Sequence, residues 1–111
     1  MTCHPLEKIS DEGAKKMLEK EIEKALVRAV KKSGGMCVKL SCQGMDGMPD
    51  RLILMRDGRC AFAELKAPGK KPRPLQVKRM KDLRSLGFSC YVIDGKDQIQ
   101  NTLDEIGGDA R

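Results

Sequence analysis

Apolar residues near the start of the chain recur with the three- and four-residue spacing of an α-helix. The members of this pattern are Met17, Leu18, Ile22, Leu26, Ala29 and Val30. Two lysines and then Gly34-Gly35 follow the pattern, and basic residues before glycine are typical of a helix end. The spacing therefore predicts one long helix over residues 10–32.

After this helix, short apolar runs alternate with breaks rich in glycine or proline. The runs predict four strands at residues 36–41, 51–55, 59–65 and 89–93. A glycine-rich loop covers residues 43–49, between the first strand and the second.

Two further helices complete the predicted order αβββαβα. Three of the five prolines lie in residues 67–74 and exclude regular structure there, while Pro74 is suited to the first turn of a helix. The helix over 74–86 has four apolar residues on one face: Val77, Met80, Leu83 and Leu86. A last helix is expected over 96–106.

The second and third strands predict a hairpin that brings two carboxylates together. Arg56–Gly58 forms a three-residue loop, whose final glycine suits a type I turn with a glycine bulge. The opposed pairs are then Leu54 with Cys60, Leu52 with Phe62, and Asp50 with Glu64. We expect the apolar half of this face to be core and the acids to lie at its open end. A two-residue turn would shift the register and separate the acids.

Asp50, Glu64 and Lys66 form a candidate metal site on this hairpin. Opposed side chains in a sheet have Cβ atoms about 4.5–5.5 Å apart, and a cation between two carboxylates removes their repulsion. Lys66 follows Glu64 at i+2 and so points to the same face, where it can orient water or stabilise charge on a phosphate. Glu-x-Lys alone is common, and the alternative is a solvated face with an ordinary charged pair.

Size and composition limit the class of protein. With 111 residues, one domain over 1–111 is expected, with flexible ends at 1–9 and 107–111. The net charge of +6 favours an acidic partner, nucleic acid rather than a membrane surface. Apolar runs are far short of the roughly 20 residues that span a bilayer, and the N-terminus has no secretion signal, so a cytoplasmic protein is expected.

The five cysteines predict neither a disulfide framework nor a zinc site. They are odd in number and widely spaced, without a Cys-x-x-Cys pair, and His4 is the single histidine. Cys37, Cys60 and Cys90 lie in apolar runs, where a buried thiol acts as a small hydrophobic residue.

A basic segment follows the candidate site directly. Residues 66–84 hold eight basic residues and one acid, Asp82, a local charge of +7. The expected DNA contacts are Lys70, Lys71, Arg73, Lys78 and Arg79. Such contacts with phosphates give affinity without sequence choice and weaken with salt. The alternative is solubility charge. Aromatic residues make up 3% of the chain, so base stacking is not the expected mode of binding.

These motifs together resemble the PD-(D/E)XK nuclease superfamily, and within it the VRR-NUC family of virus-type replication-repair nucleases. Gly47-Met48-Pro49-Asp50-Arg51-Leu52 is similar to the family's Gly-x-Pro-Asp-Arg segment, and Phe62-Ala63-Glu64-Leu65-Lys66 to its Glu-x-Lys strand. Pro74-Leu75-Gln76 and the later Gly87-Phe88 with Tyr91-Val92-Ile93 also match. The resemblance covers residues 18–99 and implies the αβββαβ core, a mixed sheet flanked by helices.

The resemblance also implies roles for particular residues. Asp50, Glu64 and the backbone carbonyl of Leu65 would hold Mg²⁺ or Mn²⁺, with Lys66 as the catalytic lysine. A glutamate of the first helix would support the metal, directly or through water. The family spacing selects Glu19, and Glu23, one turn later, stays open. Gln76 matches a helix-two glutamine that positions the site or contacts phosphate.

The expected function is therefore a metal-dependent endonuclease in which a metal-activated water attacks a phosphodiester of flap or Holliday-junction-like DNA. Small virus-encoded forms of the family resemble archaeal Holliday-junction resolvases, which implies a homodimer with a role in repair or recombination. The alternatives are a catalytically silent DNA-binding module and a subunit of a DNA-repair complex. Intact Asp50, Glu64 and Lys66 argue against the silent module.

Overall fold

The computed structural model describes residues 11–107, with side chains from residue 13 onward. The elements are α1 (Asp11–Lys32), β1 (Met36–Lys39), β2 (Arg51–Leu54), η2 (Arg56–Gly58), β3 (Cys60–Leu65), α2 (Pro74–Ser85), β4 (Ser89–Ile93), η3 (Lys96–Gln98) and α3 (Ile99–Ile106). The predicted order αβββαβα is confirmed, with β1 ending at Lys39 and the last helix beginning as a 3₁₀ turn. The expected flexible ends lie outside the described residues, apart from Gly107.

The four strands form one mixed sheet in the order β1-β2-β3-β4. β1 and β2 are antiparallel, as are β2 and β3, whereas β3 and β4 are parallel. The predicted hairpin register is confirmed, because Leu52 is opposite Phe62 and Leu54 is opposite Cys60. The pairing ends with Arg51 opposite Ala63, and one further step in the same register would set Asp50 opposite Glu64.

The hairpin turn has the predicted length but another conformation. Asp57 adopts a φ of 65°, whereas a type I turn requires negative φ at this position. Gly58 has the expected positive φ of 73°. The backbone N–H of Met55 still donates to the carbonyl of Arg59 at 2.7 Å, so the strands keep their alignment. Aspartate is among the non-glycine residues that tolerate the left-handed region.

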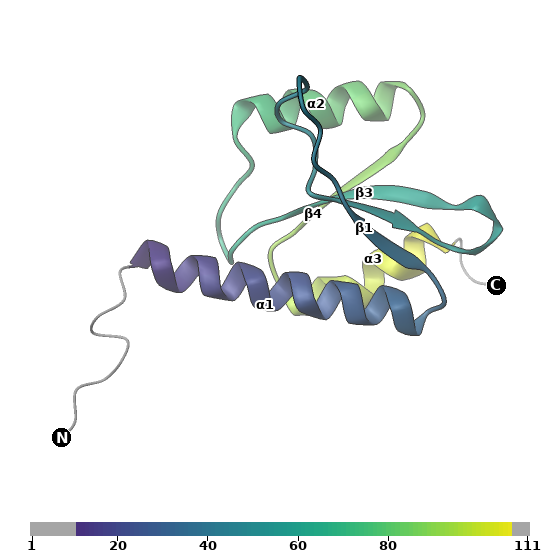
Figure 1. The fold of residues 1–111 in the computed structure, drawn as a ribbon, viewed down its shortest axis with the longest axis horizontal. Helices are drawn as coiled ribbons and strands as arrows, with labels where there is room; N and C mark the ends of the chain where they lie inside the picture. Colours follow the sequence, from purple (N-terminus) through teal and green to yellow (C-terminus); the bar gives the residue numbers. More distant parts are fainter. Residues whose placement is uncertain (1–10, 108–111) are drawn as a thin grey trace.

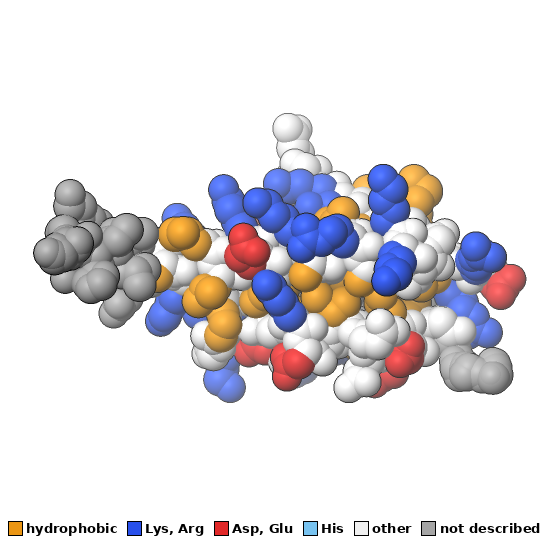
Figure 2. Space-filling view, turned by 90° about the horizontal axis from the view of Figure 1, so that it is seen from below, with side chains coloured by type: hydrophobic (Ala, Val, Ile, Leu, Met, Phe, Trp, Pro, Cys, Tyr) orange, Lys and Arg blue, Asp and Glu red, His pale blue; other side chains and the backbone are white. Residues whose placement is uncertain are grey.

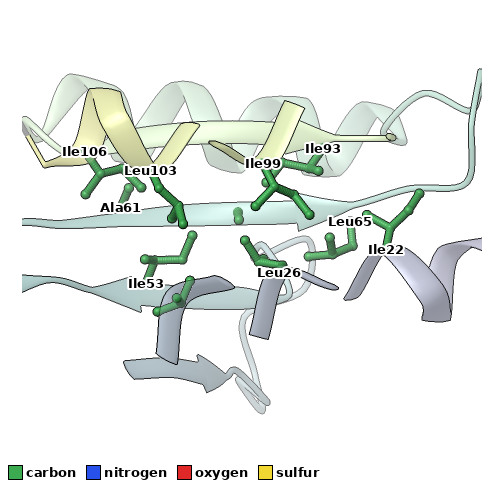
Figure 3. Packing of buried hydrophobic residues seen from close by; sticks show 11 residues of the cluster. Ile22, Leu26, Ile53, Ala61, Leu65, Ile93, Ile99, Leu103 and Ile106 are labelled. Carbon is green, nitrogen blue, oxygen red and sulfur yellow. The ribbon is translucent and has the colours of Figure 1, made fainter. Parts of the chain in front are cut away.

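The sheet lies between α2 on one face and α1 with α3 on the other (Figure 1). The main core fills the α1/α3 face, where aliphatic side chains from both helices and the central strands point toward one another (Figure 3). Its fully buried members on the central strands are Ile53, Ala61, Ala63 and Leu65.

The hairpin face expected to be core is the less buried one. Leu52, Leu54 and Phe62 are only partly buried. Strand alternation turns them away from the core residues Ile53 and Ala61, toward the face that α2 alone covers (Figure 1). The prediction chose the correct register but the wrong face for the main core, since both faces of β3 carry apolar residues.

α2 also presents a different face to the sheet from the one predicted. Of the four apolar residues expected to share a face, Met80 is buried, whereas Val77 is 41% and Leu86 is 73% exposed. Gln76, one turn before Met80, is buried with it. The packed face of α2 therefore includes a polar residue that the apolar spacing did not indicate.

The described residues contain neither a disulfide bond nor a helix that could span a membrane. Cys37, Cys42, Cys60 and Cys90 are free thiols. Cys90 is buried as expected, but Cys37 and Cys60 are only partly so. No helix in the described part of the chain has the length and apolar character to cross a membrane.

Candidate active site

The loop between β1 and β2 carries Asp50 to the sheet and is fastened at both ends. The backbone N–H of Leu40 donates to the carbonyl of Asp50 at 2.8 Å. Gly47 has a φ of +85°, and a Cβ there would come within 2.8 Å of the Leu75 side chain. Arg79 Nε donates to the carbonyl of Asp46 at 2.8 Å. The loop is therefore held against α2, with buried Pro49 directly before the acid.

The carboxylate of Asp50 is tied to the end of β3. Its Oδ2 accepts the backbone N–H of Leu65 at 3.1 Å, one residue beyond Glu64. Asp50 and Glu64 are close enough for the charge of Asp50 to act on the Glu64 carboxyl. The hairpin thus brings the two predicted acids together.

Glu64 is a buried carboxylate with one oxygen left unpaired. The residue is 1% exposed. Its Oε2 accepts from Gln76 Nε2 at 2.7 Å and pairs with Lys66 Nζ at 3.1 Å. Its Oε1 is buried and has no hydrogen-bond partner among the described residues. Leaving such an atom without a partner is costly, because the group has lost its water.

The environment of Glu64 shifts the pKa of its carboxyl upward. Burial is the largest cause that raises the pKa of this carboxyl above its ordinary value, and the nearby negative charge of Asp50 raises it further. Lys66 and Gln76 act in the opposite direction, because both stabilise the carboxylate. A cation near Oε1 would offset both effects, because it stabilises the charged form of Glu64 and compensates the negative charge of Asp50.

Gln76 holds the orientation of Glu64 from the first turn of α2. Its Oε1 accepts the backbone N–H of Arg73 at 2.9 Å, which leaves the amide nitrogen to donate to Glu64. Pro74 begins the helix and fits there because it has no N–H to satisfy. The expected positioning role of Gln76 is consistent with this arrangement.

The donors at this point suit a hard divalent cation. Mg²⁺ prefers oxygen ligands, and it is commonly held by one or two carboxylates with waters in the remaining positions. Asp50 and the unpaired Oε1 of Glu64 are such ligands. Within residues 13–107, no group of three or more His, Cys, Asp or Glu side chains is close enough to hold a metal. Glu19 therefore does not join the pair as a third clustered carboxylate.

The acids of α1 have different surroundings. Glu23 accepts from Arg51 Nε at 3.1 Å and from Arg51 Nη2 at 2.8 Å, and Arg51 Nη1 also donates to the carbonyl of Cys37 at 3.3 Å. Glu21 is exposed and lies 3.9 Å from Lys96. Glu19 is partly buried beside Lys20 at the surface of α1. Of the two acids left open by the sequence, Glu23 is engaged in fastening α1 to the sheet.

Arg51 is a structural partner that the sequence analysis did not identify. It follows Asp50 in the Gly-x-Pro-Asp-Arg segment, and the alternation of a strand turns it to the opposite face. The alternation could have indicated this contact, because it places Arg51 on the core face, where an arginine needs an acidic partner.

Of the basic residues expected to contact DNA, some have exposed side chains, whereas Arg79 is engaged in contacts within the protein. Lys71 and Arg73 are exposed. Lys78 pairs with Asp82 at 3.1 Å across one helical turn, and its side chain is 65% exposed. Arg79 reaches the Asp46 carbonyl and lies 3.6 Å from Asp82, so it fastens the loop that carries Asp50.

Two comparisons identify similar proteins. The chain is 43% identical over 79 residues to a protein named "Putative nuclease p44" from Acyrthosiphon pisum secondary endosymbiont phage 1, covering 71% of this chain and 85% of that protein. A solved structure described as "VRR_NUC domain" superposes with a TM-score of 0.73 at 28% identity, covering 78% of this chain and 94% of that one. No protein-family model matches the chain.

Proposed function

The protein belongs to the VRR-NUC family of PD-(D/E)XK nucleases, and from this premise we propose that it is a Mg²⁺- or Mn²⁺-dependent endonuclease of structured or branched DNA. The observation that supports the proposal best is the buried Glu64 carboxylate, whose Oε1 has no partner among the described residues while Asp50 lies beside it. Two neighbouring carboxylates with a buried, unpaired oxygen are unfavourable when both are charged, and a bound cation would offset that cost.

The side chains of the site have distinct roles in this proposal. Asp50, Glu64 and the backbone carbonyl of Leu65 would hold the cation, and Glu19 would support it through water. A bound divalent cation supplies a Lewis acid for the phosphoryl oxygen and lowers the pKa of a bound water. Lys66 orients the attacking water and stabilises negative charge on the phosphate. Gln76 donates to Glu64 Oε2, which leaves Oε1 free to bind the cation.

The substrate class follows from charge and from the scarcity of aromatic residues. Lys71 and Arg73 are exposed and lie on the segment that connects the site at the end of β3 to α2. Contacts of this kind bind the phosphate backbone, which favours recognition of DNA shape over sequence. We further propose a homodimer, since two copies of so small a chain would hold the two arms of branched DNA.

Cleavage assays on defined DNA structures test this function. The purified protein is incubated with linear, flap and four-way DNA in the presence of Mg²⁺, Mn²⁺ or EDTA. We expect cleavage with either metal, preferentially of branched substrates, and none with EDTA. Cleavage that persists in Asp50→Asn or Lys66→Ala would refute the proposed site. Tight, salt-sensitive binding without cleavage of any substrate would instead favour a silent DNA-binding module or a subunit that needs a partner.

A further inference from the structure

A shallow pocket lies between the first half of α1 and the segment that follows β3. Its volume is about 270 Å³. It is lined by Lys15, Lys16, Glu19, Lys20, Glu23, Ala67 and Lys70. Two segments far apart in the sequence therefore form the pocket, and no residue of α2 lines it.

The pocket carries a net positive charge, even when only the residues without a charged partner in the described part of the chain are counted. Lys15, Lys16 and Lys20 are exposed, and they make no ion pair within residues 13–107. The charge of Glu23 is compensated by Arg51. Lys70 already has a polar partner and is left out of the count. Three lysines against Glu19 leave a charge of +2.

The pocket adjoins the candidate active site through the chain itself. Ala67, which lines the pocket, directly follows Lys66. Figure 1 shows the chain passing from β3 toward α1 before it rises to α2. Figure 2, which views the molecule from the side of α1 and α3, shows Lys and Arg side chains gathered along this face. The basic residues on α2 cover the opposite face of the sheet.

We propose that this pocket binds a backbone phosphate of the DNA strand close to the phosphodiester that is cut. The inference rests on the proposed function and extends it, because it adds a contact on the α1 side of the site. Lysines are compact point charges suited to a phosphate oxygen. No aromatic side chain lines the pocket, so a base has nothing to stack against. The DNA strand would then be bound on the α1 side of Lys66 by the pocket and on the α2 side by the basic segment.

Two charge-matched double variants test the pocket. Lys16→Gln with Lys20→Gln removes two of its charges, and Lys31→Gln with Lys32→Gln removes two charges from the far end of α1. Each lowers the net charge from +6 to +4. Affinity for a branched duplex is measured in EDTA over a range of salt concentrations. We expect the pocket variant to bind about tenfold more weakly, and its salt slope to fall by about 1. The control should stay near wild type.

A second probe is a set of DNA substrates in which single phosphates are replaced by neutral methylphosphonates. In wild type, we expect one position within a few nucleotides of the cut to weaken binding, and in the pocket variant the same replacement should have no further effect. Equal affinities and slopes for the two double variants, or full sensitivity of the pocket variant to every methylphosphonate, would overturn the inference. Circular dichroism checks that both variants keep their helix content.

The failure of this inference can be told apart from failure of the nuclease proposal. Binding is measured without metal, so it does not depend on cleavage. A protein that binds through the pocket but never cuts would keep the inference and lose the nuclease. A protein that cuts normally, with the two double variants indistinguishable in binding, would keep the nuclease and lose the pocket.

Discussion

The two faces of the sheet differ most clearly along β3, where successive residues belong to different environments. Ala61, Ala63 and Leu65 point into the dry core formed with α1 and α3. Phe62 and Glu64 point to the side of α2: Glu64 is buried and accepts from Gln76 of that helix, whereas Phe62 is only partly buried. One strand therefore carries both the best-packed part of the fold and the least satisfied polar atom described.

This difference separates stability from chemistry. The α1/α3 face consists of aliphatic contacts that need no ligand. The α2 face holds an arrangement that costs free energy, because Glu64 Oε1 is buried without a partner beside Asp50. Changes on one face should alter the unfolding free energy, and changes on the other should alter metal binding and cleavage.

The largest effect is expected for Asp50→Asn. Losing one carboxylate removes a metal ligand while the side chain keeps its size, and metal catalysis worth several kcal/mol corresponds to a fall in cleavage rate of about 10³-fold. Initial rates on a branched substrate at saturating Mg²⁺ measure it. Asp57→Asn is the matched control at the opposite end of the same hairpin, where asparagine also tolerates positive φ. Similar rates for the two variants would contradict the role of Asp50.

The next effect belongs to the other face. Ile53→Ala should lower the unfolding free energy by about 2–5 kcal/mol, because a fully buried side chain leaves a cavity. Leu52→Ala, its partly buried neighbour on the α2 side, should cost less. Urea unfolding measures both. The cleavage rate of Ile53→Ala should stay near wild type at a temperature where the protein is folded. A larger loss of stability for Leu52→Ala would show that the α2 face is the principal core.

The same contrast explains what could be predicted from the sequence. Element order and hairpin register follow from period and loop length, so the pairing that brings Asp50 opposite Glu64 was accessible from local rules. The choice of core face was not, because Leu52, Leu54 and Phe62 are as apolar as Ile53, and only the number of covering helices distinguishes the faces.

The surroundings of the site were also beyond local rules. The buried face of α2 includes Gln76, although apolar spacing favoured Val77 and Leu86. The contact between Arg51 and Glu23 joins residues 28 positions apart, and that of Arg79 with Asp46 joins residues 33 apart. Such contacts depend on how the helices dock. The hairpin register and the family motif both selected Asp50 and Glu64 as candidate site acids, whereas the docking of the helices decided their partners.

A smaller effect on catalysis is expected for Gln76→Ala. The variant loses a hydrogen bond that orients Glu64, and a fall of about 10–100-fold in metal affinity or activity is typical of such changes. The pH profile should also move. Gln76 stabilises the Glu64 carboxylate, so its loss raises the pKa of Glu64 further and shifts the rising limb of activity to higher pH.

The control for this change is Gln100→Ala, which removes an exposed glutamine of α3 bonded to Asp104. Its pH profile should match that of wild type. If Gln76→Ala lowered the rate without moving the profile or the Mg²⁺ requirement, Gln76 would act on the DNA rather than through Glu64.

Without metal, Glu64→Gln should change the pH dependence of stability. The folded-state pKa of Glu64 lies above its ordinary value of 4.5, so the folded protein keeps a proton that the unfolded chain releases. Stability from this group is fully present below 4.5 and is lost as pH rises through the raised pKa. In EDTA, Glu64→Gln should lack this loss and melt above wild type at neutral pH.

Mg²⁺ should reverse that order, because a ligand that binds only the folded state stabilises it. Glu21→Gln, an exposed change on α1, should follow wild type under both conditions. A wild-type melting temperature unaffected by Mg²⁺ would argue that the burial of Glu64 has no metal to offset it.

The smallest effect is expected for the aromatic pair on the α2 face of the sheet, and it measures how tightly that face is packed. Phe62 and Phe88 form an edge-to-face pair with ring centroids 5.8 Å apart. A double-mutant cycle with Phe62→Leu and Phe88→Leu should give a coupling of about 0.5–1.5 kcal/mol, since aromatic pairs contribute this much beyond their burial. Urea unfolding of the four proteins measures it. Cleavage rates should change little, because both substitutions keep an apolar side chain and remove none of the polar contacts of Glu64. A coupling near zero would mean that the Phe62–Phe88 pair, with Phe88 42% exposed, adds nothing to the packing of this face beyond the burial of each ring.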